Sequence, residues 1–254
     1  MATLTVFTPL YNRINTLKRT YESLKRQTSK DFVWLIIDDG STDNPYEIIK
    51  EWIKINNGFE IRYVYKKNGG MHTAHNTAYE NIDTELNVCV DSDDYMPDNA
   101  VQLIIDCWNK NKNKGYAGII ALDFADSTKK VIGKELPTDK ESTTLMGYYN
   151  NGGFGDKKLI YRTDIIKQTP PYPVFDNEKY VALAYKYHLI DEKYELKILN
   201  ECVCIVDYQM DGSSTNMYRQ YVRNPKGFAF WRKEQMKHSI NTKQKLVFTM
   251  FQVL

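Results

Sequence analysis

Phe32-Val-Trp-Leu-Ile-Ile37 is an uninterrupted apolar run, and Asp38-Asp-Gly-Ser-Thr-Asp43 follows it directly. A strand with one face in water alternates apolar and polar side chains, so six apolar residues in a row predict a strand covered on both faces. The acidic, glycine-containing hexapeptide after it is a dense turn signal. The stretch therefore predicts an inner strand of a parallel sheet that ends in a polar turn.

Strand-like and helix-like segments alternate around this stretch. Helical spacing of apolar residues is present at 15–27, 46–55, 73–81 and 97–109, with Pro97 opening the last helix. Further strands are predicted at 4–8, 61–65, 86–90 and 119–122. This β-α-β-α order predicts an α/β fold with a mostly parallel central sheet flanked by helices. Such sheets bind ligands beyond the carboxyl ends of their strands.

The second half of the chain is less regular. Asn151-Gly-Gly-Phe-Gly155 predicts a flexible loop, and residues 168–173 are rich in proline. Helices are predicted at 179–189 and 224–238, with a strand at 198–206 between them.

Composition and charge exclude several classes of protein. The 254 residues suffice for one large α/β domain. Lys and Arg number 34 against 32 Asp and Glu, so the net charge of +2 creates no basic field that favours nucleic acid. No apolar run reaches the roughly 18 residues of a membrane-spanning helix, and the N-terminus lacks the features of a signal peptide. The four cysteines form no C-x-x-C pair, which favours free thiols in a reducing cytoplasm.

Asp91-Ser-Asp-Asp94 places three carboxylates in four residues directly after a predicted buried strand. Such charges repel one another unless a cation lies between them, and magnesium and manganese prefer oxygen ligands. A solvated acidic loop is the alternative. An EF-hand is excluded, because Met96 and Gln102 occupy the positions that need glycine and glutamate.

Two further stretches follow predicted strands. Asp39 can accept a hydrogen bond from a nucleoside, whereas Ser41 and Asp43 can instead cap the next helix. The glycines of Asn68-Gly-Gly70 allow close approach of a ligand to a helix N-terminus, although no G-x-G-x-x-G or P-loop pattern is present. His72 and His75, which follow in this helix, are expected to have structural or hydrogen-bonding roles.

A carboxylate pair opens the predicted helix at 179–189. Asp176 or Glu178 can serve as a general base, and the alternative is that this stretch caps the helix.

Taken in order, four motifs resemble those of the inverting family 2 glycosyltransferases of bacterial polysaccharide type, which have the GT-A (nucleotide-diphospho-sugar transferase) fold. They are Thr8-Pro-Leu-Tyr-Asn-Arg13, Ile37-Asp-Asp-Gly-Ser-Thr-Asp43, Asn68-Gly-Gly with Ala74-His-Asn76, and Asp91-Ser-Asp-Asp94. The set covers roughly the first 120 residues. The second half matches more loosely, through Glu178-Lys-Tyr-Val181, Asp211-Gly-Ser-Ser-Thr215 and Asn224-Pro-Lys-Gly227.

The resemblance implies roles for individual residues. Asp39 would hold the nucleotide base, usually uracil, and Asp91 would face the ribose. Asp93, with Asp91, would bind Mn²⁺ or Mg²⁺ on the diphosphate, and Asp94 would lie near the sugar or acceptor. The remaining implied contacts of the nucleotide-sugar are Pro9, Tyr11, Arg13, Asn68, Gly70, Asn76 and Ser92.

The family often has Glu-Asp at its catalytic base, whereas this chain has Glu178-Lys179. The resemblance therefore implies Glu178 as the base, with Asp176 as the second choice. No histidine clearly completes the metal shell, so Asp211 or a water would take that place.

The resemblance implies a metal-dependent hexosyltransferase that uses a nucleotide-diphosphate sugar, most often a UDP-sugar. The absence of Q-x-x-R-W favours transfer of single sugars. A carbohydrate or lipid-linked saccharide acceptor in cell-surface polysaccharide assembly is expected. The protein would be cytoplasmic, and basic residues between Arg219 and Lys245 are compatible with peripheral contact at the inner face of the cell membrane. The oligomeric state is left open.

Three parts of the chain are expected on this basis. Residues 1–120 would bind the nucleotide-sugar, residues 121–215 would supply the acceptor site and base, and residues 216–254 would form a helical extension. Two other functions remain open at this point, a nucleotidyltransferase and a non-catalytic module that binds sugar nucleotides or carbohydrate.

Overall fold

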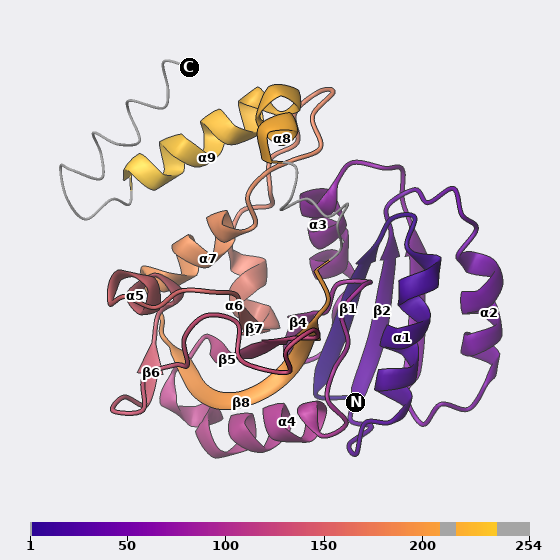
Figure 1. The fold of residues 1–254 in the computed structure, drawn as a ribbon, viewed down its shortest axis with the longest axis horizontal. Coiled ribbons are helices and arrows are strands. Elements are labelled where there is room, and N and C mark those ends of the chain that lie inside the picture. Colours follow the sequence, from indigo (N-terminus) through magenta and orange to yellow (C-terminus); the bar gives the residue numbers. More distant parts are fainter. Residues whose placement is uncertain (1, 209–216, 238–254) are drawn as a thin grey trace.

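The computed structural model describes residues 2–208 and 217–237 (Figure 1). Its strands are β1 (Leu4–Leu10), β2 (Phe32–Asp38), β3 (Glu60–Tyr65), β4 (Leu86–Cys89), β5 (Gly118–Ala125), β6 (Ser142–Thr143), β7 (Lys157–Arg162) and β8 (Leu196–Val206). Its helices are α1 (Ile14–Lys25), α2 (Tyr46–Lys54), α3 (Met71–Asn81), α4 (Ala100–Asn111), α5 (Leu145–Asn150), α6 (Thr163–Gln168), α7 (Ala184–Asp191), α8 (Met217–Arg223) and α9 (Pro225–Lys237), with a short 3₁₀ helix at Lys112–Lys114.

The described strands form one mixed sheet in the order β3-β2-β1-β4-β7-β5-β8-β6. Strands β3, β2, β1 and β4 are parallel neighbours, and β5 pairs in parallel with β8. Strand β7 is antiparallel to β4 and β5, and β6 is antiparallel to β8. The expected α/β architecture with a mostly parallel sheet is confirmed.

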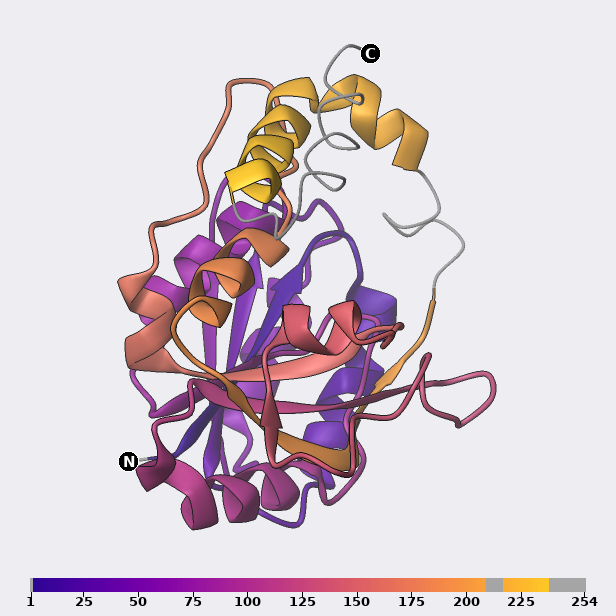
Figure 2. The same cartoon turned by 90° about the vertical axis from the view of Figure 1, so that its left-hand side faces the viewer.

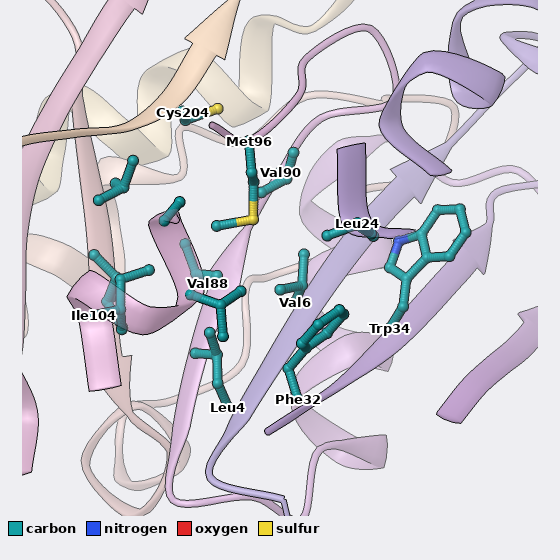
Figure 3. Close-up of a cluster of buried hydrophobic side chains, with 14 of the residues drawn as sticks. Leu4, Val6, Leu24, Phe32, Trp34, Val88, Val90, Met96, Ile104 and Cys204 are labelled. Carbon is teal, nitrogen blue, oxygen red and sulfur yellow. The ribbon is translucent and has the colours of Figure 1, made fainter. Parts of the chain in front are cut away.

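Alternate side chains of the inner strands enter two separate cores. Leu4, Val6 and Trp34 face the layer of α1, α2 and α4 (Figure 3). Phe7 and Leu35 face the opposite layer, which contains α3, α5, α6 and α7. Because successive side chains of a strand point to opposite faces, β2 needs apolar residues at every position. All seven of its residues are buried.

Three expectations about local structure are wrong. Helix α4 begins at Ala100 because Pro97 lies in the preceding loop, where its carbonyl accepts hydrogen bonds from Ala100 N and Gln27 Nε2. Helix α7 begins at Ala184 and not at Lys179, because the Lys179 amide donates to Asn224 Oδ1 and the Tyr180 carbonyl packs against Gly227 of α9. Strand β7 was not expected, and it separates β4 from β5.

The expected boundary at residue 120 falls within β5 (Gly118–Ala125), so the first two parts of the chain share one sheet. Of the expected extension 216–254, residues 217–237 are described and form α8 and α9. The four cysteines are free thiols. Cys204 is buried, and the other three are half-buried.

Helices α8 and α9 lie at one end of the molecule, with α4 at the other (Figures 1 and 2). Strands β1 and β2 point their carboxyl ends toward the end that holds α8 and α9 (Figure 1). The edge of the sheet where ligands are expected therefore faces this helical pair. Across the described ranges, no helix combines the length and apolarity required to cross a bilayer.

The contact between β5 and β7 predicts that Gly118 is difficult to replace. At Gly118, φ is +151° and an added Cβ would overlap the Ile160 carbonyl oxygen across the strand pair. We expect Gly118→Ala to lower the free energy of unfolding by about 3 kcal/mol or more, because the backbone of β7 must shift. Urea unfolding followed by circular dichroism measures the loss.

Gly115→Ala is the matched control. Gly115 also has a positive φ, +77°, but an added Cβ there meets no atom within 4 Å. Its loss should be about 1 kcal/mol, from backbone strain alone. Equal losses in the two variants would show that the β5–β7 contact is not the constraint described.

Candidate active site

The acidic loop, residues 91–94, continues from β4 at the carboxyl edge of the sheet. Helix α1 holds its backbone: Arg19 Nη2 donates to Asp93 O at 2.5 Å, and Thr20 Oγ1 donates to Asp94 O at 2.7 Å. The next residue, Tyr95, exchanges two backbone hydrogen bonds with Ile205 of β8. The loop is therefore fixed through its main chain, which leaves its carboxylates to face other groups.

Asp91 and Asp93 are half-buried, whereas Asp94 is only 4% exposed. Burial, followed by the neighbouring charge of Asp91, raises the pKa of Asp93. Burial raises the pKa of Asp94 to about 7, and Asp94 Oδ1 accepts a hydrogen bond from Asp207 N at 3.1 Å. Burial is the main cause of both shifts, and the neighbouring aspartates add to them, so a cation bound here would favour the charged carboxylates.

The donor set fits a hard divalent cation. Magnesium is commonly held by one or two carboxylates together with substrate phosphates, so Asp91 and Asp93 suffice as protein ligands. Within residues 2–208 and 217–237, no three His, Cys, Asp or Glu side chains gather into a metal site. Asp211, expected as a further ligand, lies outside the described residues.

A buried lysine, Lys158, lies near the acidic loop. Lys158 of β7 pairs with Asp123 of β5, with 3.6 Å between Nζ and Oδ1, and their side chains are 12% and 4% exposed. Burial alone would lower the pKa of Lys158, but Asp123, Cys204, Asp94 and Asp91 together raise it. Lys158 therefore offsets part of the acidic charge from inside the protein. Nothing in the sequence marked this residue, because β7 itself was not expected.

Asp39 is clamped by the loop that follows β3. Its Oδ1 accepts from Lys66 Nζ at 2.5 Å and from Gly69 N at 2.9 Å, and its Oδ2 accepts from Asn68 Nδ2 at 3.0 Å and from Gly70 N at 2.8 Å. The structure thus brings together Asp39, Asn68 and Gly70, three of the expected donor-binding residues. Lys66 was not among the residues expected from the sequence, although a lysine near the end of a strand that flanks an acidic turn is a usable signal.

The turn after β2 is tied to the turn after β1. Ser41 Oγ accepts from Asn12 N at 3.1 Å, and Asp43 Oδ2 accepts from Ile14 N at 3.1 Å. Ser41 and Asp43 therefore do not cap α2, the alternative considered from the sequence, because they hold the chain at the start of α1.

The other expected donor-binding residues surround this edge. Pro9 is buried in β1, and Tyr11 is exposed just beyond it. Arg13 precedes α1, and its charge lies close enough to Asp93 to oppose the rise in that residue's pKa. Asn76, in contrast, is engaged with the backbone of Tyr172, donating to its oxygen and accepting from its nitrogen, both at 2.9 Å.

Ser92 is buried, and its backbone oxygen accepts a hydrogen bond from Thr20 Oγ1 at 3.5 Å. The two histidines of α3 are buried as well. Burial lowers the pKa of His72 to about 4 and that of His75 to about 3, so both rings are neutral near pH 7. His75 Nδ1 lies 3.2 Å from Tyr79 Oη and its Nε2 lies 3.7 Å from Cys89 Sγ, in keeping with the hydrogen-bonding role expected.

Glu178 binds the N-terminus of α9. Its Oε1 accepts from Lys226 N at 3.0 Å, and its Oε2 accepts from Gly227 N at 2.8 Å. A carboxylate suits this position because the first amides of a helix lack partners within the helix. The capping role weighed for this stretch is thus real, but the helix it serves is α9. Asp176 is exposed in the turn just before it.

Solved structures show the class of fold. Residues 1–349 of S. aureus TarS, in complex with UDP-GlcNAc, match 99% of this chain and 71% of that one with a TM-score of 0.69 at 17% identity. The mannosyltransferase PcManGT of Pyrobaculum calidifontis, in complex with GDP-Man and Mn²⁺, matches 92% of this chain and 61% of that one with a TM-score of 0.58 at 15% identity. The expected GT-A fold is confirmed.

The family model described as Glycosyl transferase family 2 matches residues 5–169, well over half of the 254 residues. The chain therefore belongs to the family 2 glycosyltransferases, as the motifs indicated.

Curated relatives are longer than the region they share with this chain. The glycosyltransferase GlyA of Streptococcus pneumoniae serotype 4 is 34% identical over 101 residues, which are 40% of this chain and 14% of that protein. A chondroitin synthase of Escherichia coli is 33% identical over 156 residues, which are 61% of this chain and 20% of that protein. The chain thus spans a small part of the length of these relatives.

The buried pair of Lys158 and Asp123 leads to a pH-dependent prediction. We expect Lys158→Met to lower the free energy of unfolding by about 3 kcal/mol at pH 8, because Asp123 is left buried without a partner. Burial raises the pKa of Asp123 to about 6, so its charged form costs stability as the pH rises through that value. As the pH falls toward about 4, the ordinary pKa of an unfolded aspartate, Asp123 is protonated in the folded state and this cost in stability disappears.

Urea unfolding of both proteins at pH 8 and pH 4.5 tests this, with a much smaller loss expected at pH 4.5. Lys54→Met is the control, since it removes an exposed pair with Glu51 and should change little at either pH. A loss for Lys158→Met that is the same at both pH values would indicate a packing defect and contradict the charge argument.

Proposed function

We propose that this chain transfers a single sugar from a nucleotide-diphosphate sugar, most often a UDP-sugar, to an acceptor hydroxyl with inversion at the anomeric carbon. The observation that carries the proposal is the pair of half-buried carboxylates, Asp91 and Asp93, held by their backbone at the carboxyl edge of a family 2 domain. The clamped loop of Asp39 lies at the end of β2 on the same edge.

The donor would lie along this edge. Pro9, Tyr11 and Asp39 with its loop would contact the nucleoside, and Arg13 would lie beside the diphosphate near Asp93. Asn68 and Gly70 would act by shaping the loop, and Ser92 and Asp94 by shaping the acidic turn. Two similar structures support a donor of this class, since TarS is described with UDP-GlcNAc and PcManGT with GDP-Man. Asn76 would support the pocket through its contact with Tyr172.

Asp91 and Asp93 would hold Mn²⁺ or Mg²⁺. When bound, the cation would neutralise charge that accumulates on the departing nucleotide diphosphate. Two similar structures, those of PcManGT and of the glycosyltransferase GalNAc-T7, are complexes with Mn²⁺. Arg13 would lie beside the diphosphate. The hydrogen bonds from Arg19 and Thr20 to backbone carbonyls would keep the acidic loop in place near it.

Glu178 would act as the general base. Each of its oxygens accepts one amide hydrogen bond and keeps a further lone pair that can accept from an acceptor hydroxyl. As that proton moves to Glu178, the acceptor oxygen forms a bond to the anomeric carbon and the bond to the nucleotide diphosphate breaks. A single in-line displacement of this kind inverts the carbon. Asp176 is the second choice for the base.

The acceptor would be a carbohydrate or a lipid-linked saccharide in cell-surface polysaccharide assembly, with the protein in the cytoplasm. Support comes from relatives named chondroitin synthase and hyaluronan synthase, of which this chain covers only a part.

Donor binding is the first test. We expect UDP-GlcNAc, UDP-glucose or GDP-mannose to raise the melting temperature of the protein in the presence of Mn²⁺, because ligand bound to the folded state stabilises it. Asp93→Asn should abolish the increase, while Asp176→Asn should keep it. No shift with any nucleotide-sugar, with or without Mn²⁺, would reject the donor site and favour a module that binds carbohydrate alone.

The base is tested by transfer to an acceptor in variants that still bind the donor. Glu178→Gln should lower the rate at least about 100-fold, which is the usual contribution of a general base. Asn224→Ala is the matched control, because Asn224 Oδ1 accepts from Lys179 N in the same corner but offers no base. An equal loss in both variants would assign Glu178 a structural role. A loss confined to Asp176→Asn would move the base to that residue.

A further inference from the structure

Helix α8 exposes apolar side chains that a folded domain ordinarily covers. Tyr218 is 82% exposed, Val222 is 66% exposed and Tyr221 is 47% exposed. Arg219, Arg223 and Lys226 are exposed beside them. We call these six residues the α8 face. Exposed apolar groups that cluster in this way mark a binding surface more often than isolated ones do.

The charge around this face has one sign. Residues 217–233 contain five basic residues, Arg219, Arg223, Lys226, Arg232 and Lys233, and no aspartate or glutamate. The whole chain is nearly balanced, at 34 basic against 32 acidic residues. The local excess is therefore a property of α8 and the start of α9, and it complements an anionic partner.

Helix α9 explains why the face points outward. Phe228 is buried between two rings, with centroid distances of 4.4 Å to Tyr180 and 4.0 Å to Tyr221. Further along, Trp231 lies 4.8 Å from His188 of α7. These contacts attach α9 to the body of the protein, and α8 packs on α9, so the outer side of α8 is left without a described neighbour.

We propose that the α8 face docks onto an anionic lipid surface. Tyrosine is enriched where bilayer meets water, and arginine and lysine attract acidic headgroups, so the combination on one short helix fits this partner. Contact with protein is the alternative, because tyrosine and arginine are also enriched at protein interfaces, and the test below separates the two. The face lies at the end of the molecule toward which the carboxyl ends of β1 and β2 point (Figure 1).

The corner between α8 and α9 connects this face to the candidate active site. Asn224 donates to Gln220 O at 2.9 Å and accepts from Lys179 N at 2.7 Å, and Glu178 binds the first amides of α9. Docking would therefore hold Glu178 at a fixed height above the lipid. If the proposed function is correct, on which this last step rests, the acceptor is a saccharide anchored in that membrane.

Vesicle flotation with the full chain tests the docking. We expect binding to vesicles of phosphatidylcholine with 30% phosphatidylglycerol, and little binding to pure phosphatidylcholine. Arg219→Gln with Arg223→Gln should lower the partition coefficient at least tenfold, and Tyr218→Ser with Val222→Ser should also lower it. Lys50→Gln with Lys54→Gln is the matched control, which removes the same charge from α2 and should bind like the parent.

Equal binding to both kinds of vesicle, no binding, or unchanged binding in both α8 variants would overturn the proposal. A change in sedimentation coefficient of the α8 variants, without a change in vesicle binding, would assign the face to contact between copies of the chain. Donor-induced thermal shifts in the same proteins separate the two proposals. Vesicle binding without any donor shift leaves docking intact and rejects the transferase, and the reverse result rejects docking alone.

Discussion

Repulsion between carboxylates at the carboxyl end of β4 is the constraint around which the rest of the fold is arranged. Asp91, Asp93 and Asp94 occupy one turn, and burial raises the pKa of Asp93 and Asp94. Two devices keep the turn in place. Side chains of α1 hold its carbonyl groups, and Lys158 supplies positive charge from below. Both devices act through groups other than the carboxylates of Asp91 and Asp93.

Strand β7 is what makes the second device available. It runs antiparallel between β4 and β5, and this places Lys158 opposite Ala121, next to the end of the acidic turn. A strand parallel to β4 at this place would instead need a longer crossover connection. The strand that interrupts the parallel sheet, β7, is therefore also the strand that supplies the positive charge of Lys158.

The first half of the fold could be predicted because its strands and helices have strong local signals. Phe32 to Ile37 is covered on both faces and is uniformly apolar, and the acidic turns mark the ends of β2 and β4. In the second half, β8 and α9 match the strand and helix expected at 198–206 and 224–238, but β6, β7, α5 and α6 were not expected, because these short elements are stabilised by distant partners. Residues 179–183 have helical spacing, but the Lys179 amide donates to Asn224, and Gly227 packs against the Tyr180 carbonyl, so α7 does not begin before Ala184.

The site shows the same division. The clustering of Asp39 with Asn68 and Gly70 followed from motifs at adjacent strand ends. Lys158 and the amides that hold Glu178 had no local signal, since each depends on residues far away in the sequence. Sequence periodicity indicates how a side chain packs within its own helix or strand. Lys158 and these amides instead contact residues of other elements.

Glu178 and α9 have a practical consequence for dissecting the chain. Every strand of the described sheet ends by Val206, so a fragment that stops shortly after β8 would contain the complete sheet and both apolar cores up to α7. It would lack the amides of Lys226 and Gly227 and the rings that cover Tyr180. The shortest fragment with the complete sheet and the shortest fragment with the amides that hold Glu178 therefore differ in length, and limited proteolysis that trims the C-terminal helices would separate one from the other.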